Sequence, residues 1–252
     1  MRLALLAIPA VRSALSLEIG REIEYHPEIA STQDRARALA AAGFGPSVVV
    51  ADLQTAGQGT RGRSWQSPAG ASLLASWLFR PAPAEPGLFA LLAGVAVARA
   101  LEHLGMRDAS LKWPNDVETG QKKVAGALAH ATTDAEGGSL VLGIGVNVHQ
   151  RLDDFSAELR ASATSVALAG PSVDRLALFV DLTRELDRVA VPGERSAALA
   201  EWRTRSTVLG REVEVIREGR PLLRGVARDI ADDGALLVGS ERVVVGDVRA
   251  LK

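Results

Sequence analysis

An apolar stretch at residues 87–105 (GLFALLAGVAVARALEHLG) restricts the fold more than any other feature of the sequence. Its apolar residues fall on nearly every side of a helix, so this helix must be covered from several directions. Gly105 is a typical signal for the end of a helix. A helix of this kind needs a sheet to pack against, and the flanking sequence supplies candidate strands. We therefore expect an α/β domain built around a central helix.

Strands and two further helices are predicted on both sides of the central helix. Ser31 and Asp34 have the spacing of a capping box that opens a helix over residues 32–42. Another helix is predicted over residues 174–190, with an apolar face made of Leu176, Phe179, Val180, Thr183 and Leu186. The strand candidates are short apolar runs at residues 46–52, 71–79, 109–113, 123–131 and 139–148.

A small all-β module is predicted at the C-terminus. It contains the hairpin signal Asp-Asp-Gly at residues 232–234. Its strand candidates are short alternating runs at residues 211–216, 222–230, 234–239 and 242–251. The predicted fold class is therefore α/β (α+β), with a mixed sheet and helices in residues 1–206 and a β-domain in residues 207–252.

The overall composition excludes several kinds of function. A formal net charge of −1 gives the whole chain no electrostatic reason to bind nucleic acid or an anionic membrane. Without cysteine, the chain has no disulfides, zinc–thiolate sites or thiol nucleophile. Residues 1–16 resemble a secretory signal, but Arg12 interrupts an apolar run far shorter than the ~20 residues of a membrane span. We interpret them as an element packed on the core and expect a cytoplasmic protein.

The glycine-rich segment from Gly57 to Trp65 (GQGTRGRSW) begins with the pattern G-x-G-x-x-G. A dinucleotide-binding loop needs a helix that starts at its third glycine and an acidic residue about 20 positions later. After Gly62 come Arg63, Ser64, Trp65 and then Ser-Pro-Ala-Gly, which opposes a helix, and no acidic residue ends a strand near Arg80. The segment is therefore predicted to be a loop between two strands.

Side chains within this segment favour a binding site over a plain surface loop, the alternative that the glycines alone leave open. Arg61 and Arg63 stand two positions apart, so in an extended segment both would point to the same side, toward an anion. Trp65 adds a flat and largely apolar surface.

Polar side chains also gather where three predicted strands begin or end. Lys112, Asn115 and Asp116 follow one strand within KWPNDV, Lys123 precedes small residues in KVAG, and Asn147 ends the run GIGVNV. A cation beside a carboxylate suits a metal-bound phosphate. Taken singly, the lysines are equally compatible with solvated charges, and Asp116 and Asn147 with turn caps.

Taken together, these motifs resemble the biotin–protein ligase family, from about residue 20 to the C-terminus. The resemblance implies ATP-dependent activation of biotin to biotinyl-5′-AMP with release of pyrophosphate. It also implies transfer of biotin to a lysine of a biotin carboxyl carrier protein, with Mg²⁺ accompanying the ATP and an SH3-like barrel as the C-terminal module. The motifs, in order, are STQ (31–33), QTAGQGTRGRSW (54–65), KWPNDV (112–117), KVAG (123–126) and GIGVNV (143–148).

The resemblance also implies residue roles. Lys123 lies against the biotin carboxylate and the forming acyl–phosphate bond, while Arg63 and Lys112 meet the nucleotide phosphates. Asp116 completes the predicted catalytic set; it either holds Mg²⁺ or receives a proton from the acceptor lysine, and the metal ligands stay unassigned. The biotin-binding residues implied are Ser31, Thr32, Gln33, Gln54, Gly57, Gln58, Gly59, Thr60, Arg61, Lys123 and Gly126. The ATP-binding residues implied are Arg63, Trp65, Lys112, Asn115 and Asn147.

Two other functions are compatible with parts of this pattern. A biotin-responsive repressor needs a DNA-binding module of roughly 60 residues before Ser31, and only 30 residues precede it. A lipoate or octanoate ligase shares the broad fold, but Gln54 and residues 62–65 match the biotin branch. We therefore expect a monofunctional biotin–protein ligase with no nucleic-acid or membrane partner. Members of the family commonly form homodimers, which this sequence neither marks nor excludes.

Overall fold

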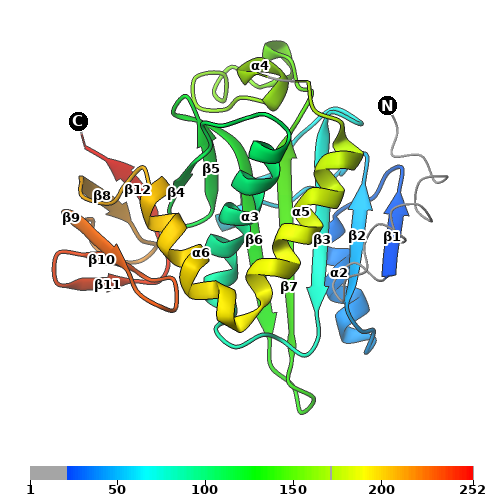
Figure 1. Cartoon of the computed structure of the whole chain (residues 1–252), viewed down its shortest axis with the longest axis horizontal. Coiled ribbons are helices and arrows are strands. Elements are labelled where there is room, and N and C mark those ends of the chain that lie inside the picture. Colours follow the sequence, from blue (N-terminus) through cyan, green and yellow to red (C-terminus); the bar gives the residue numbers. More distant parts are fainter. Residues whose placement is uncertain (1–21, 171, 252) are drawn as a thin grey trace.

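A seven-stranded sheet and a smaller five-stranded sheet make up the framework of the protein (Figure 1). The computed structural model describes residues 22–170 and 172–251, so the N-terminal element expected at residues 1–16 lies outside the described residues. Helices cover both faces of the large sheet. The strands of the small sheet come after the last helix in the sequence. The predicted class, an α/β domain with a C-terminal β-module, is confirmed.

The large sheet is mixed because β1 and β2 are parallel, whereas the other neighbouring strands are antiparallel. Helix α2 (Thr32–Ala41) makes the crossover between the parallel strands. The spatial order is β1-β2-β3-β7-β6-β5-β4. The strands are β1 (Glu22–His26), β2 (Ser47–Ala51), β3 (Ser72–Phe79), β4 (Ser110–Lys112), β5 (Asp116–Thr119), β6 (Lys122–Thr132) and β7 (Ser139–Asn147).

Different helices cover the two faces of the large sheet, because alternate residues of a strand point to opposite faces. On β2, Val48 and Val50 belong to the main core, whereas Val49 packs in a small cluster with Ala36 and Leu39 of α2. The main-core face carries α3 (Phe89–His103), α5 (Arg175–Ala190) and α6 (Pro192–Arg205), as Figure 1 shows.

Helix α3 is the central core helix that its sequence predicts. It contacts α5, α6 and β6, and most of its residues are buried. By length and composition alone, Pro86–His103 would suit a membrane span, but 67% of this stretch is buried inside the fold. Its apolar surface on all sides therefore serves the packing of the sheet and the neighbouring helices.

Four α-helices and strands were not predicted from the sequence, namely β1, β5, α4 (Val166–Ala169) and α6. Strand β5 begins at Asp116, so this residue starts a strand and is not a turn cap, the alternative role considered for it. Helix α6 buries only Ala198, Leu199 and Trp202, which are too few to produce a clear helical period. A third helix on this face was therefore invisible to pattern analysis.

The buried face of α5 differs in part from the prediction. Leu176 and Val180 are only half-buried, whereas Leu178 and Leu182 are fully buried. Both α3 and α6 contact α5, so its apolar face is wide and periodicity alone does not locate its centre. The expected members that are buried are Phe179, Thr183 and Leu186.

The C-terminal module is a five-stranded antiparallel sheet with the order β11-β10-β9-β8-β12. Gly234 has a φ of +90°, as a hairpin glycine in the predicted Asp-Asp-Gly turn requires. The run 242–251, predicted as one strand, is divided into two. The strands are β8 (Glu212–Ile216), β9 (Leu223–Ile230), β10 (Leu236–Val238), β11 (Glu241–Val243) and β12 (Asp247–Ala250).

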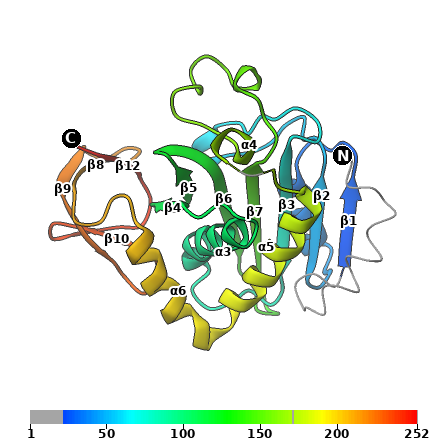
Figure 2. The same cartoon turned by 45° about the horizontal axis from the view of Figure 1, so that its top comes forward.

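The module lies beside α6 and the β4–β5 end of the large sheet, opposite β1 (Figure 2). Among the hydrogen bonds that attach it there, two reach β4 and the segment after it. The Thr207 amide donates to the Leu111 carbonyl at 2.8 Å, and Trp113 Nε1 donates to the Gly234 carbonyl at 3.0 Å. The second bond links the KWPNDV segment directly to the module.

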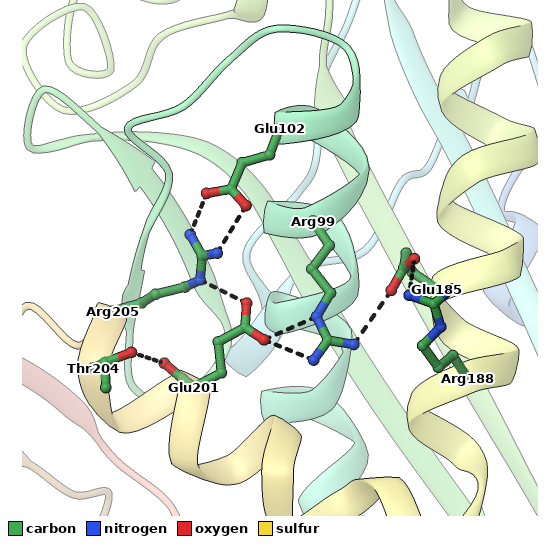
Figure 3. Close-up of polar contacts among 7 residues, drawn as sticks. All are labelled: Arg99, Glu102, Glu185, Arg188, Glu201, Thr204 and Arg205. Atoms are coloured by element: carbon green, nitrogen blue, oxygen red, sulfur yellow. Dashed lines mark hydrogen bonds and ion pairs between the residues drawn. The ribbon is translucent and has the colours of Figure 1, made fainter.

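An ion-pair network joins the three helices on the main-core face (Figure 3). Arg99 of α3 lies 2.7 Å from Glu201 of α6 and 3.3 Å from the buried Glu185 of α5. Arg205 binds Glu201 at 2.9 Å and Glu102 at 2.6 Å. Burial opposes the charge of Glu201, but hydrogen bonds from Arg99 and Arg205 hold its pKa below the ordinary 4.5.

The lowered pKa of Glu201 predicts a pH-dependent contribution to stability. This contribution is fully present above pH 4.5 and is lost as the pH falls through the lower folded-state pKa. We expect Glu201→Gln to lower the free energy of unfolding by about 1–2 kcal/mol at neutral pH, with a difference from the natural chain that shrinks below pH 4.5. Urea unfolding between pH 3 and pH 8 is the measurement. The exposed Glu218→Gln is the control, and a difference that persists at the lowest pH contradicts the prediction.

Candidate active site

A pocket of about 470 Å³, part of it open to solvent, lies over the middle of the large sheet beside the start of α2. Its walls come from α2, from the glycine-rich loop and from β3, β6 and β7. The lining residues are Thr32, Gln33, Gln54, Gln58, Gly59, Thr60, Trp65, Leu74, Ala75, Ser76, Asn115, Lys123, Gly126, Ala127, Leu128, Gly143, Ile144 and Gly145.

The glycine-rich loop connects β2 to β3 and folds back on itself. The Gly59 amide donates to the Arg63 carbonyl at 2.7 Å, and the Trp65 amide donates to the Gly57 carbonyl at 2.9 Å. Only a single 3₁₀ turn, Thr60–Gly62, interrupts it. No α-helix begins at the third glycine, so the loop lacks the helix N-terminus of a dinucleotide-binding site, as the sequence predicts.

Trp65 lies against a glycine floor formed by two paired strands. Gly126 of β6 and Gly145 of β7 are register partners. A Cβ at Gly145 would come within 2.6 Å of Trp65 Cε2, and one at Gly126 within 2.9 Å of Lys123 Nζ. Lys123 Nζ lies 5.6 Å from the indole ring centroid. These glycines thus make room for the indole and for the lysine side chain.

One end of the pocket is a network of neutral polar groups. Gln54 Oε1 accepts hydrogen bonds from the Thr32 amide at 2.7 Å and from the Thr32 hydroxyl at 3.0 Å. The Thr32 hydroxyl also lies 2.8 Å from the Ser76 hydroxyl. Gln33 donates to the carbonyls of Leu128 and Val141. This end offers hydroxyls and an amide in defined orientations.

The other end of the pocket is charged. Lys123 Nζ lies 2.5 Å from Asp116 Oδ1, which comes from the adjacent strand β5. Asn115 Nδ2 donates to the Ala127 carbonyl at 2.5 Å, which fixes the segment between β4 and β5 against β6. Within residues 22–170 and 172–251, no group of three or more His, Cys, Asp or Glu side chains is placed to hold a metal ion.

Most of the residues predicted for the site meet at this pocket. Ser31, Gly57 and Asp116 do not line it but lie next to residues that do: Ser31 precedes Thr32 and caps the start of α2 by accepting a hydrogen bond from the Asp34 amide, Gly57 abuts Trp65, and Asp116 binds Lys123. The predicted residues that line the pocket are Thr32, Gln33, Gln54, Gln58, Gly59, Thr60, Trp65, Asn115, Lys123 and Gly126.

Four predicted residues have partners elsewhere. Lys112 lies 3.3 Å from Glu118, and the buried Asn147 donates to the Thr164 carbonyl at 2.9 Å. Arg61 and Arg63 do point to the same side, but the loop around them is not extended, and the anion that they meet is a carboxylate of the C-terminal module.

Ser76 was not predicted for the site, and Gly143 and Gly145 entered the prediction only as part of the motif GIGVNV. Ser76 is fully buried in β3 and interrupts an otherwise apolar strand, which was the available signal. At Gly143, a Cβ would lie 2.2 Å from Gln33 Oε1, so the glycine allows the amide to pack on the sheet. The available signal for the two glycines was their place in the motif GIGVNV.

The fold and the pocket define the class of this protein. Residues 28–147 match the Biotin/lipoate A/B protein ligase family, and residues 208–248 match the Biotin protein ligase C terminal domain. The chain is a member of the biotin protein ligase family. The C-terminal match covers the five-stranded module, which accounts for its presence beside the ligase domain.

Relatives and solved structures agree with this assignment. Biotin--[acetyl-CoA-carboxylase] ligase of Mycobacterium tuberculosis is 34% identical over 229 residues, covering 86% of this chain and 84% of that protein. The biotin protein ligase of Aquifex aeolicus in complex with biotin and ATP has a TM-score of 0.75 and 26% identity, covering 92% and 100% of the two chains.

A bifunctional relative is longer than this chain. Bifunctional ligase/repressor BirA of Bacillus subtilis is 38% identical over 172 residues, which cover 66% of this chain. The chain thus spans about half, 53%, of the length of that relative.

The contact between Trp65 and Gly145 predicts that even one methyl group will displace the indole. We expect Gly145→Ala to raise the quenching of Trp65 fluorescence by acrylamide and to cost about 1–3 kcal/mol of unfolding free energy through overpacking. The other three tryptophans are fully buried, so quenching reports on Trp65. Gly193→Ala is the matched control, because its Cβ would meet nothing within 4 Å. Quenching at the level of the natural chain would mean that the floor tolerates a side chain.

Proposed function

We propose that this protein is an ATP-dependent, AMP-forming biotin–protein ligase. It activates biotin to biotinyl-5′-AMP and transfers the biotin to a lysine of a biotin carboxyl carrier protein. One observation carries the proposal, namely that a single pocket has hydroxyls and an amide at one end and Lys123 at the other. The relative from M. tuberculosis, named a biotin--[acetyl-CoA-carboxylase] ligase, and the structure from A. aeolicus with biotin and ATP support it.

The neutral end of the pocket suits the ureido ring of biotin. That ring has two N–H donors and one carbonyl acceptor, and Thr32, Gln54 and Ser76 offer both kinds of partner. A buried group left without its partner costs about 1–3 kcal/mol, so these side chains select for a ligand with this pattern. Trp65 and the glycine floor supply the apolar surface for the rest of the ligand.

The charged end suits the activation step. A biotin carboxylate oxygen attacks the α-phosphorus of ATP, a new acyl–phosphate bond forms, and the bond to the β-phosphate oxygen breaks so that pyrophosphate leaves. Two anions approach in this step, and the Lys123 ammonium offsets their repulsion. Asp116, 2.5 Å away, orients Lys123 Nζ. In the transfer step, the acceptor amine attacks the acyl carbon and forms an amide bond. The bond from the acyl carbon to the phosphate oxygen breaks so that AMP leaves, and the amine proton passes to water.

Mg²⁺ enters this scheme as part of the ATP substrate. Mg²⁺ in nucleotide sites is commonly held by one or two carboxylates together with substrate phosphates. Asp116 is a carboxylate at the charged end, and it is already paired with Lys123. The protein therefore offers few oxygen ligands for Mg²⁺ at this end of the pocket, and the ATP phosphates would provide most of them.

We propose further that the reaction takes place in the cytoplasm.

Pyrophosphate exchange into ATP tests this proposal, with biotin, lipoate and octanoate compared in parallel. We expect only biotin to support rapid exchange, because only biotin matches the donors and acceptors at the neutral end of the pocket. Exchange with lipoate or octanoate but not with biotin would identify the protein as a different acyl ligase. Site-selective DNA retention in a filter-binding assay would instead support a repressor function.

Lys123→Ala is predicted to lower the rate of adenylate formation by about 10²-fold or more, because it removes charge compensation where two anions meet. Transfer from pre-made biotinyl-adenylate should suffer less. Single-turnover measurement of the two half-reactions separates these effects. Lys122→Ala is the matched control, since the neighbouring lysine donates to the Arg160 carbonyl and does not line the pocket. Equal losses in both half-reactions would contradict this role.

A further inference from the structure

Two arginines of the glycine-rich loop bind one carboxylate of the C-terminal module. Arg61 Nη1 forms an ion pair with Asp247 Oδ2, and Arg63 Nη2 lies 3.3 Å from Asp247 Oδ1. Arg61 Nη2 also donates to the Ile216 carbonyl at 3.3 Å. Asp247 of β12 and Ile216 of β8 lie directly opposite each other in the module's sheet, so Arg61 contacts one pair of opposed residues.

The two arginines are held unequally. The Arg61 side chain is 25% exposed and has two partners in the module, whereas that of Arg63 is 60% exposed. Arg63 also donates to the Thr60 carbonyl and hydroxyl, at 3.3 and 2.9 Å, within its own loop. Arg61 is therefore the firmer attachment, and Arg63 is the arginine that remains accessible to an anion.

The contact constrains an unfavourable loop conformation. Arg61 has a φ of +58°, in the left-handed region that non-glycine residues rarely adopt. The 3₁₀ turn that contains it buries no residue. With little packing to support the turn, the bonds of Arg61 to Asp247 and to the Ile216 carbonyl attach it to the rest of the fold.

The active-site pocket adjoins a cleft next to the module. Thr60 and Asn115 line both the pocket and this cleft, and Asp247 lines the cleft together with Arg61. Gln58, Gly59 and Thr60 form the loop side of the pocket itself. A shift of the Arg61 turn would therefore open the pocket toward the cleft.

We propose that Asp247 is a positioning residue of the active site. Through Arg61 and Arg63, the C-terminal module holds the glycine-rich loop over the pocket, and the loop retains the acyl-adenylate between the two half-reactions. This inference rests on the proposed function. It gives the C-terminal module a role in retaining the intermediate, although no residue of the module lines the pocket.

The first test is hydrogen exchange on the full chain without ligand. The amides of Gly59 and Trp65 are bonded within the loop, so their exchange reports how often it opens. We expect Asp247→Asn to speed exchange of residues 57–65 by about 3- to 10-fold, the effect of losing partly exposed ion pairs. Glu214→Gln is the matched control, because it breaks the Glu214–Arg224 pair of the same module without touching the loop. The urea midpoint of unfolding should be the same for both variants.

The second test is release of biotinyl-adenylate formed on the enzyme, followed after a chase. We expect release to be about 3- to 10-fold faster for Asp247→Asn, unchanged for Glu214→Gln and partly restored in Asp247→Glu. Arg61→Gln should reproduce the effect, and the double variant Arg61→Gln with Asp247→Asn should add little to it.

The two tests distinguish a failure of the proposed function from a failure of the role of Asp247. If the natural chain forms no adenylate, the proposed function is wrong, whatever the exchange data show. If the natural chain forms adenylate and Asp247→Asn releases it at the natural rate, Asp247 does not position the loop for retention. Additive effects of Arg61→Gln and Asp247→Asn would also overturn the inference, because the two residues would then act independently.

Discussion

A buried ion pair at the base of the glycine-rich loop is the constraint on which the site depends. Arg175 of α5 lies 2.8 Å from Asp52, and the two side chains are 3% and 7% exposed. Arg175 also donates to the Ser72 carbonyl at 2.9 Å, and Tyr25 donates to Asp52 at 2.7 Å. One guanidinium therefore holds the end of β2 and the start of β3 together. Losing one partner of such a pair leaves an uncompensated buried charge, at a cost of about 3–5 kcal/mol.

From this base, the loop reaches two surfaces of different character. On the sheet, Trp65 lies on Gly145 of β7, next to Gly126 of β6. Because these two residues have no side chains, the surface under the indole is flat. On the module, Arg61 and Arg63 meet Asp247, in a contact between half-exposed charges that can open. The anchored base and the weaker outer contact together suit a loop that must admit a ligand and then hold it.

Several features of the fold and of the site could be predicted from the sequence. The all-round apolarity of α3, the N-cap of Ser31 and the alternating strands of the module are local patterns, and each was found where expected, apart from the run 242–251, which forms two strands. Helix α6 and strand β1 escaped prediction because few of their residues are buried. Thr32, Gln54 and Lys123 meet at one pocket, as the motif resemblance implied, although nothing in their spacing alone requires this.

The sequence by itself determined the class of fold and the residue types of the site, because periodicity, turn glycines and caps act over a few neighbouring residues. Tertiary structure alone decided which charges meet. Lys123 pairs with Asp116 through the register of β5 and β6, and Arg61 reaches Asp247, 186 residues away. Such partners depend on strand register and on the placement of the module against the sheet. Strand register and the placement of the module are both set by packing over the whole chain, and a pattern within a few neighbouring residues cannot predict them.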